Sequence, residues 1–128
     1  MFNLERLTYA MATHEGWSLV GTPGNPTGSK SYRNHNPGNL RSSPLAVGQA
    51  DGFAVFRTDD DGFAALRLDI MQKATGHTTT GLNGSSTLAQ LIAIWAPAAD
   101  GNAPAAYLAH ICQLTGFSPQ MQLKDLLL

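Results

Sequence analysis

The sequence predicts a mainly helical domain of the α+β class, with four to six helices around a small β-hairpin or flap. Three observations predict it. Apolar residues repeat at helical spacing near the N-terminus and through most of the second half. One short apolar run, residues 53–57, is bounded by turn residues, as strands are. Between the first helix and this strand lies a segment rich in Gly, Pro, Asn and Ser, residues 18–52, which we interpret as an ordered binding loop.

The first helix is predicted from four apolar residues that share one face: Leu4, Leu7, Met11 and Ala12. Its pattern breaks at Glu15, before Gly16 and Trp17. Within the long loop, a weak second strand near Leu40 would pair with the strand at 53–57. That pairing would complete the hairpin.

The next two helices are predicted from start signals followed by apolar faces. Three aspartates at 59–61 suit a helix start, because carboxylates cap and complement the N-terminal dipole. The face that follows them contains Phe63, Leu66 and Ile70. After a polar turn region at 74–84, Ser85 or Ser86 is expected to cap a helix that Pro97 ends. Its face contains Leu88, Leu91, Ile92 and Trp95.

Two further helices complete the predicted fold. Pro104 suits the first position of a helix, and Gly116 suits its end. The apolar face between them contains Tyr107, Leu108, Ile111 and Leu114. A short last helix is expected from Ser118-Pro119, with Met121, Leu123 and Leu126 on its apolar face.

Composition limits the classes of function. With 128 residues the chain has room for one domain with a core, and its 13% charged content is well below the usual value of about 25%. Its polar surface therefore depends on neutral side chains, which suit a sugar ligand. A net charge of −1 argues against a general nucleic-acid binder. Six basic residues in the middle of the chain indicate a positive cleft for an anionic polymer or, equally well, charge balance against nearby aspartates: Lys30, Arg33, Arg41, Arg57, Arg67 and Lys73.

Cysteine count and hydropathy exclude other classes. Cys112 is the only cysteine, so no internal disulfide is expected. Its place among apolar residues of a helix indicates a buried, inert thiol. No segment is long and apolar enough for a membrane span, and no signal peptide is expected, so delivery to an extracytoplasmic site would depend on other proteins.

Glu15 is the strongest candidate for chemistry. It is one of two glutamates and falls where the first helix meets Gly16 and Trp17. An indole beside a carboxyl penalises the charged form, and the negative end of a helix adds to that penalty. We therefore expect Glu15 to be partly protonated near neutral pH, as the general acid of a glycosidase must be. The alternative is a solvated surface residue, which is common near helix ends.

A resemblance to a known family rests on motifs that keep the same order along nearly the whole chain. They are YRNHNPGNLR at 32–41, FAVFRT at 53–58, GFAAL at 62–66, the helix from Thr87-Leu88 to Trp95-Ala96-Pro97, and Asp100-Gly101-Asn102 with Tyr107. In these motifs the chain resembles the phage-associated lysozyme-like muramidases and lytic transglycosylases.

The resemblance implies a lysozyme-like fold, with residues 1–128 as a single catalytic domain that cleaves the MurNAc–GlcNAc β-1,4 bond of peptidoglycan. It implies that Glu15 is the catalytic acid and that Thr58 is a catalytic hydroxyl at the end of the β segment. Soluble lytic transglycosylases have Glu-Ser where this chain has Glu15-Gly16, so it departs from that branch. Residues expected to bind substrate, by lining the cleft or bracing its loop, are Trp17, Tyr32, Arg33, Asn36, Asn39, Arg41 and Tyr107.

The mechanism depends on a second carboxylate. A hydrolase needs two acids about 5–5.5 Å apart for retention, or about 6.5–9.5 Å apart for inversion. The candidates are Asp59, Asp60 and Asp61, although helix capping also explains all three. A lytic transglycosylase needs Glu15 alone, which would protonate the leaving oxygen and then act as base on the C6 hydroxyl. Because no second acid is clearly placed, we favour this route.

Other signals are weaker. His14-Glu15 does not continue into a zinc motif, because position 18 is Ser, and neither metal nor cofactor is implied. For His35 a contact with substrate is one alternative, and an exposed loop histidine is the default expectation. Trp95 and Tyr107 suit a helix core as well as a sugar platform. Expected partners are peptidoglycan glycan strands and other virion or secretion-apparatus proteins, in a phage virion or at the bacterial periplasm and cell wall.

Two rival interpretations remain open. The first is a lysozyme-like virion or wall-binding protein that has lost activity. The second is a cysteine peptidase or amidase that uses Cys112 and a histidine.

Overall fold

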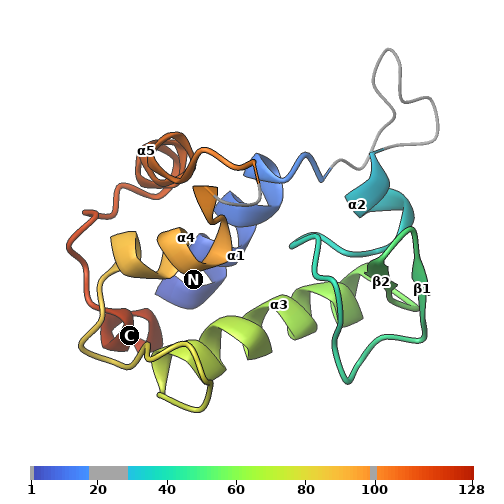
Figure 1. Cartoon of the computed structure of the whole chain (residues 1–128), viewed down its shortest axis with the longest axis horizontal. Coiled ribbons are helices and arrows are strands. Elements are labelled where there is room, and N and C mark those ends of the chain that lie inside the picture. The colour runs from blue at the N-terminus through green and yellow to red at the C-terminus, as the bar shows by residue number, and fades with distance from the viewer. Residues whose placement is uncertain (1, 18–28, 99–100) are drawn as a thin grey trace. The chain divides into compact units, whose positions relative to one another are not determined.

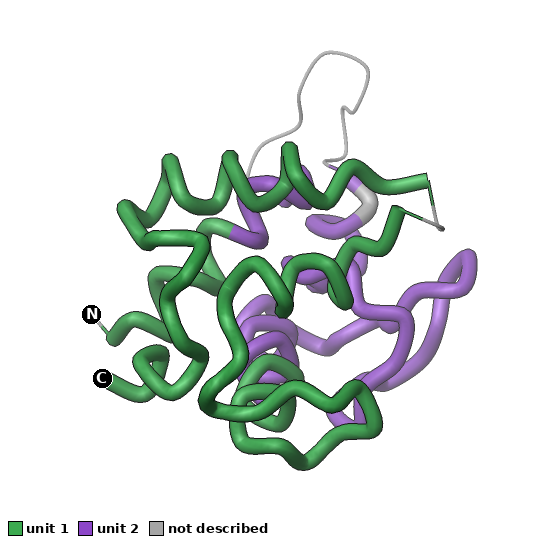
Figure 2. The backbone as a smooth tube through the Cα atoms, turned by 60° about the vertical axis from the view of Figure 1, so that its left-hand side comes forward, with its two compact units in different colours: residues 1–10, 69–128 green, residues 11–68 purple. Residues whose placement is uncertain are grey.

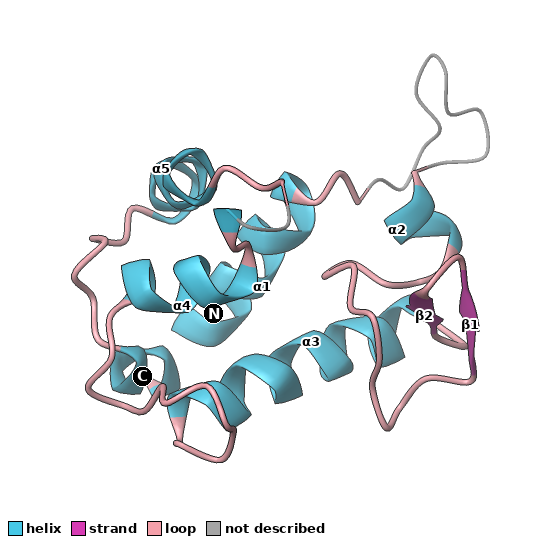
Figure 3. Cartoon of the chain, in the orientation of Figure 1, coloured by secondary structure: helices cyan, strands magenta, loops and turns pink. Residues whose placement is uncertain are grey.

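The computed structural model describes residues 2–17, 29–98 and 101–128. Within these ranges it has five α-helices, a final 3₁₀ helix and one two-stranded antiparallel sheet, as Figure 1 and Figure 3 show. This confirms the predicted class, mainly helical with a small hairpin. Residues 18–28 of the predicted binding loop and Asp100 of the Asp100-Gly101-Asn102 motif lie outside the described residues.

The chain divides into two compact units, which Figure 2 colours separately. Unit 1 comprises residues 1–10 and 69–128, and unit 2 comprises residues 11–68. Helix α1 (Asn3–His14) begins in unit 1 and ends in unit 2. Helix α3 (Asp59–Ala74) begins in unit 2 and ends in unit 1. The expectation of a single domain over residues 1–128 stays a prediction.

Unit 1 has an aliphatic core to which five helical segments contribute. They are the start of α1, the end of α3, α4 (Leu88–Trp95), α5 (Pro104–Thr115) and the 3₁₀ helix Leu123–Leu127. Fully buried side chains come from every one of them, at the spacing that the sequence predicted for the helical faces: Leu7, Ile70, Leu88, Leu91, Ile92, Ile111, Leu123 and Leu126.

The two ends of the chain meet within unit 1. The Asn3 backbone N–H donates to the Leu128 carbonyl at 3.1 Å, and the Asn3 side chain donates to the Asp125 carbonyl at 3.0 Å. Arg6 donates to the Thr115 carbonyl at the end of α5, and its guanidinium lies 4.7 Å from the Phe117 ring centre. A cation at this position satisfies a terminal carbonyl and complements the helix dipole.

Helix α4 (Leu88–Trp95) begins one or two residues later than the sequence predicted. Its N-cap is Thr87, so the expectation that Ser85 or Ser86 caps it was wrong. The Thr87 hydroxyl accepts from the Gln90 N–H at 3.2 Å, and the Gln90 side chain accepts from the Thr87 N–H at 2.8 Å. Thr87 makes both bonds of a capping box, because Gln90 is the third residue after it.

The predicted bounds of α5 are confirmed. Pro104 is the first residue of the helix, and Gly116 follows its last residue with φ 77° in the left-handed region.

The last predicted helix starts later than expected. Ser118-Pro119 lies in a turn, and the short helix at Leu123–Leu127 is of the 3₁₀ type. The intervening segment bonds instead to the start of α4, through Thr87 and Gln122 as an isolated β-bridge.

Unit 2 contains the hairpin. Strand β1 (Gly48–Ala50) pairs with β2 (Phe53–Val55), and Asp51-Gly52 forms the two-residue turn with φ 52° and 81°. Positive φ at both turn positions matches the right-handed strand twist, which explains an Asp-Gly pair here. The second strand therefore lies at residues 48–50, and the expected strand at Leu40 was wrong. Leu40 nevertheless bonds β2, because its carbonyl accepts from the Ala54 N–H at 2.9 Å.

A short helix, α2 (Lys30–Arg33), lies in the segment that the sequence presented as irregular. The loop that follows it, residues 34–41, is called the site loop below. It runs along β2, where the Phe56 N–H donates to the Asn34 carbonyl at 2.9 Å. It also packs closely on α3, because a Cβ at Gly62 would lie 1.9 Å from the His35 carbonyl oxygen. The site loop is thus held between β2 and the first turn of α3.

Among the described residues, no helix is long and apolar enough to cross a membrane.

We predict that Gly62→Ala destabilises the protein. Alanine favours a helix over glycine by about 1 kcal/mol. The new methyl would, however, meet a backbone carbonyl at 1.9 Å and the Pro37 ring at 2.8 Å, and neither can rotate away. Overpacking should therefore dominate, with a net loss of about 1–3 kcal/mol in the free energy of unfolding.

Urea denaturation measures this loss, and Gly48→Ala is the matched control. A Cβ at Gly48 meets nothing within 4 Å, so its effect should stay within about 0.5 kcal/mol. Equal stability of the two variants would show that the site loop is not held tightly against α3.

Candidate functional site

Glu15 occupies the C-cap of α1. The Glu15 N–H donates to the Met11 carbonyl at 2.9 Å, and Gly16 follows with φ 81°. The Gly16 N–H donates to Thr13 at 3.1 Å and the Trp17 N–H to Ala12 at 3.0 Å. These are the two bonds of a Schellman turn, which explains why glycine follows the glutamate. The turn fixes the backbone of Glu15, and its side chain is half-buried.

Trp17 is the aromatic centre of unit 2. Its ring meets the Phe63 ring edge-on at 5.3 Å and the Tyr32 ring at 6.1 Å. Edge-to-face pairs at these distances are favourable beyond the area that they bury. Through them the end of α1 is joined to α2 and α3. Its indole Nε1 is buried and has no hydrogen-bond partner among the described residues.

Asn36 is the internal brace of the site loop. Its side-chain amide donates to the Leu40 carbonyl at 2.8 Å and to the Ala54 carbonyl at 2.9 Å, and its Oδ1 accepts from the Leu40 N–H at 2.9 Å. The residue is fully buried. Of the two roles expected for Asn36, the structure therefore shows bracing, because every described bond goes to backbone and no surface remains for a substrate.

Two other asparagines of the site loop carry buried polar atoms without partners among the described residues. These atoms are Asn34 Nδ2 and Asn39 Oδ1. Asn39 also has φ 50°, a left-handed conformation that asparagine tolerates better than most residues. Unsatisfied buried polar atoms are uncommon in native proteins, and sites that bind a ligand or water are one cause.

The two arginines of the motif are exposed. Arg41 lies over the Phe53 ring, with its guanidinium carbon 4.9 Å from the ring centre, and its backbone carbonyl accepts from Gln49 Nε2 at 3.3 Å. Arg33 ends α2. Both therefore keep their charged groups on the surface of unit 2, as an anionic ligand would require.

Thr58 serves as the N-cap of α3. Its hydroxyl accepts from the Asp61 N–H at 3.1 Å, and its carbonyl accepts from the Gly62 N–H at 3.1 Å. The cap is therefore Thr58, and the expectation that the aspartates cap this helix was wrong. They occupy its first turn, where Asp59 bonds His35 Nδ1 at 2.8 Å and Asp60 and Asp61 are exposed. A catalytic role for the Thr58 hydroxyl stays a prediction.

Tyr107 is 5% exposed and lies on α5 in unit 1, unlike the other predicted site residues. This burial fits the core alternative and leaves little ring surface for a sugar. Trp95, also in unit 1, is half-buried, with Lys73 Nζ 5.5 Å from its ring centre.

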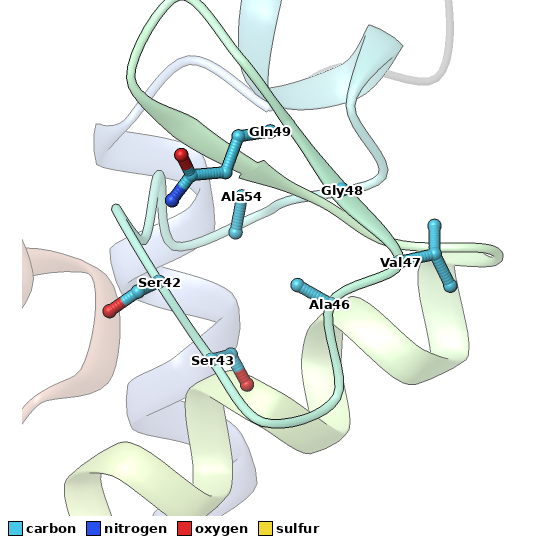
Figure 4. Close-up of a pocket in the computed structure, with 7 residues that line it drawn as sticks. All are labelled: Ser42, Ser43, Ala46, Val47, Gly48, Gln49 and Ala54. Atoms are coloured by element: carbon cyan, nitrogen blue, oxygen red, sulfur yellow. The ribbon is translucent and has the colours of Figure 1, made fainter.

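An open hollow of about 510 Å³ lies beside the hairpin, as Figure 4 shows. Ala46 and Ala54 point toward one another across it, whereas Val47 points away. Its lining has no charged side chain: Ser42, Ser43, Ala46, Val47, Gly48, Gln49 and Ala54. Sequence inspection missed it, because only the pairing of β1 with β2 brings residues 42–49 and Ala54 together.

The remaining chemical candidates are weak. No group of three or more His, Cys, Asp or Glu side chains in the described ranges can hold a metal ion. Cys112 is half-buried in α5, and burial raises the pKa of its thiol above the ordinary value. A raised pKa lowers the thiolate fraction at neutral pH, which disfavours a nucleophilic role.

Comparison with protein-family models, with curated proteins and with solved structures returned no significant match. The likeness to lysozyme-like enzymes therefore rests on the sequence motifs alone.

We predict that Asn36→Asp destabilises the protein by about 3 kcal/mol or more. The aspartate keeps the shape but cannot donate two hydrogen bonds, so it faces two buried carbonyl oxygens without compensation. The free energy of unfolding in urea measures the loss.

Asn83→Asp is the control for Asn36→Asp. Asn83 is exposed, and its Oδ1 accepts from the Ser85 N–H at 2.8 Å, a bond that a carboxylate also makes. Its stability should change by less than about 0.5 kcal/mol. Similar losses in both variants would show that the donors of Asn36 are dispensable.

Proposed function

We propose that this protein is a peptidoglycan glycosidase in which Glu15 is the general acid. The observation that carries the proposal is the position of Glu15 at the C-cap of α1, fixed by a Schellman turn directly before Trp17. A general acid must be held in one place relative to the glycosidic oxygen, and a rigid helix end does this better than a loop.

Three other features of unit 2 support a sugar substrate. Trp17 places an indole two residues from the carboxyl, in contact with Tyr32 and Phe63. The hollow beside the hairpin is lined by small neutral groups, which recognise hydroxyl and amide groups without charge. Exposed Arg33 and Arg41 supply positive charge for the anionic wall polymer.

In the proposed reaction, Glu15 donates its proton to the oxygen of the MurNAc–GlcNAc bond as that bond breaks. We favour the transglycosylase route, in which the resulting carboxylate removes the proton of the C6 hydroxyl and that oxygen closes on C1. Asp59, the half-buried aspartate of α3, is bonded to His35, and Asp60 and Asp61 are exposed. None of the three has an arrangement that marks it as a second catalytic acid.

We expect Glu15→Gln to lower kcat on purified peptidoglycan by about 10²–10⁴-fold, because it removes the proton that the leaving group needs. Glu5→Gln is the matched control, since Glu5 is the only other glutamate and lies in the first turn of α1. It should retain wild-type turnover. Thermal unfolding of both variants checks that the fold is kept.

The chemical form of the released muropeptides distinguishes lytic transglycosylation from hydrolysis. Mass spectrometry of released muropeptides should show anhydro ends, lighter by one water than hydrolysis products. Reducing ends would replace the transglycosylase proposal with a hydrolase. If wild type and Glu15→Gln bind sacculi equally and neither turns them over, the protein is a wall-binding module and the enzyme proposal is wrong.

We expect alkylation of Cys112 to leave lytic activity unchanged. Because its thiol pKa is raised, the thiolate is scarce at pH 8, and iodoacetamide should modify it more slowly than it modifies a free cysteine. Loss of activity in step with modification, followed by mass spectrometry, would instead support the cysteine-enzyme interpretation. Cys112→Ala should behave as the alkylated protein does.

A further inference from the structure

His35 lies in a backbone conformation that favours glycine. Its φ is 52°, and it follows the end of α2, where the His35 N–H donates to Tyr32 at 3.1 Å and the Asn36 N–H donates to Ser31 at 2.7 Å. These bonds form a second Schellman turn, whose left-handed position is normally occupied by glycine. A side chain with a Cβ is disfavoured there, and backbone strain of this kind gathers at functional positions.

Asp59 fixes the orientation of that imidazole. Its Oδ1 lies 2.8 Å from His35 Nδ1. A carboxylate oxygen can only accept, so Nδ1 carries the proton and Nε2 of the neutral ring has a lone pair. The backbone of His35 is also held in place, because its carbonyl packs directly against Gly62 of α3.

The imidazole is oriented but still accessible. Its side chain keeps 43% of its surface exposed, although it is bonded at Nδ1. In the sequence His35 stands between Asn34 and Asn39, whose buried polar atoms have no partners among the described residues. An accessible acceptor held in a fixed direction by a neighbouring carboxylate is what a site uses to recognise a hydroxyl group.

We propose that His35 contacts the substrate, with Nε2 accepting a hydrogen bond from a sugar hydroxyl, and that Asp59 is its positioning residue. This inference rests on the proposed function for the identity of the ligand. The inference adds His35 as a binding residue, and the argument for His35 does not depend on Glu15. It also gives Asp59 a role other than catalytic acid.

The first test measures thermal stability, to distinguish a structural role of His35 from a role in binding. His35→Gly removes the strain together with the Asp59 bond, so its midpoint of thermal unfolding should equal or exceed that of wild type. His35→Ala keeps the strain and loses the bond, so it should unfold at a lower temperature. A fall for His35→Gly as large as that for His35→Ala would assign the histidine to the fold and overturn the proposal.

Asp51→Gly is the matched control, because Asp51 has the same φ of 52° and is exposed in the hairpin turn. It should gain or keep stability as His35→Gly does. Its affinity for glycan should not change.

The second test measures binding of a soluble GlcNAc oligomer by calorimetry and of purified sacculi by sedimentation. His35→Gly and His35→Ala should both weaken binding about five- to tenfold, the value of one hydrogen bond. Wild-type affinity in His35→Gly would overturn the proposal. A wild type that binds neither probe would overturn it together with the proposed function, whereas loss of turnover alone in Glu15→Gln leaves it standing.

Asp59 is tested by conservative rescue. Asp59→Asn keeps an oxygen that accepts from Nδ1, so binding should stay within about twofold of wild type. Asp59→Ala should weaken binding about threefold, because the ring loses its orientation. Equal binding by Asp59→Ala and wild type would remove Asp59 from the proposal.

Discussion

The carboxamide of Asn36 connects two parts of unit 2 at one point. Its two donors and one acceptor bond the backbone of Leu40 and Ala54, so the site loop and strand β2 share a single fully buried group. An unmade hydrogen bond at such depth costs far more than a made one contributes. The bonds of Asn36 therefore stabilise the observed conformation of the loop over alternatives that leave them unmade. The positions of its exposed members, Arg41 and His35, follow from that constraint.

A second fixed point is the end of α1. The Schellman turn at Gly16 leaves Glu15 no freedom in its backbone, and it directs Trp17 onto the rings of Phe63 and Tyr32. The proposed acid and α2, the helix that leads into the site loop, are thus attached to the same aromatic cluster. A glycosidase needs such attachment, because a displacement of about 1 Å between acid and glycosidic oxygen can cost a hundredfold in rate.

Strain and unsatisfied polar groups gather in the same segment. His35 and Asn39 both have positive φ, and Asn34 and Asn39 hold buried polar atoms without partners in the described part of the chain. A loop selected for stability alone would have glycine at the left-handed positions and paired amides. Their concentration in residues 34–39 supports placing the site there, independently of any argument from Glu15.

The sequence by itself determined the helices, because apolar residues repeated every three or four positions share one face only in a helix. Leu88, Leu91 and Ile92 are spaced in this way, and all three are buried. It also determined the helix ends at Glu15 and Gly116, where glycine terminates a helix locally. Tertiary structure alone decided that the site loop bonds β2, through Asn36 and Leu40, and that His35 pairs with Asp59 across 24 residues. Those outcomes depend on hydrogen bonds between segments distant in the chain, and no local periodicity records which donor will meet which acceptor.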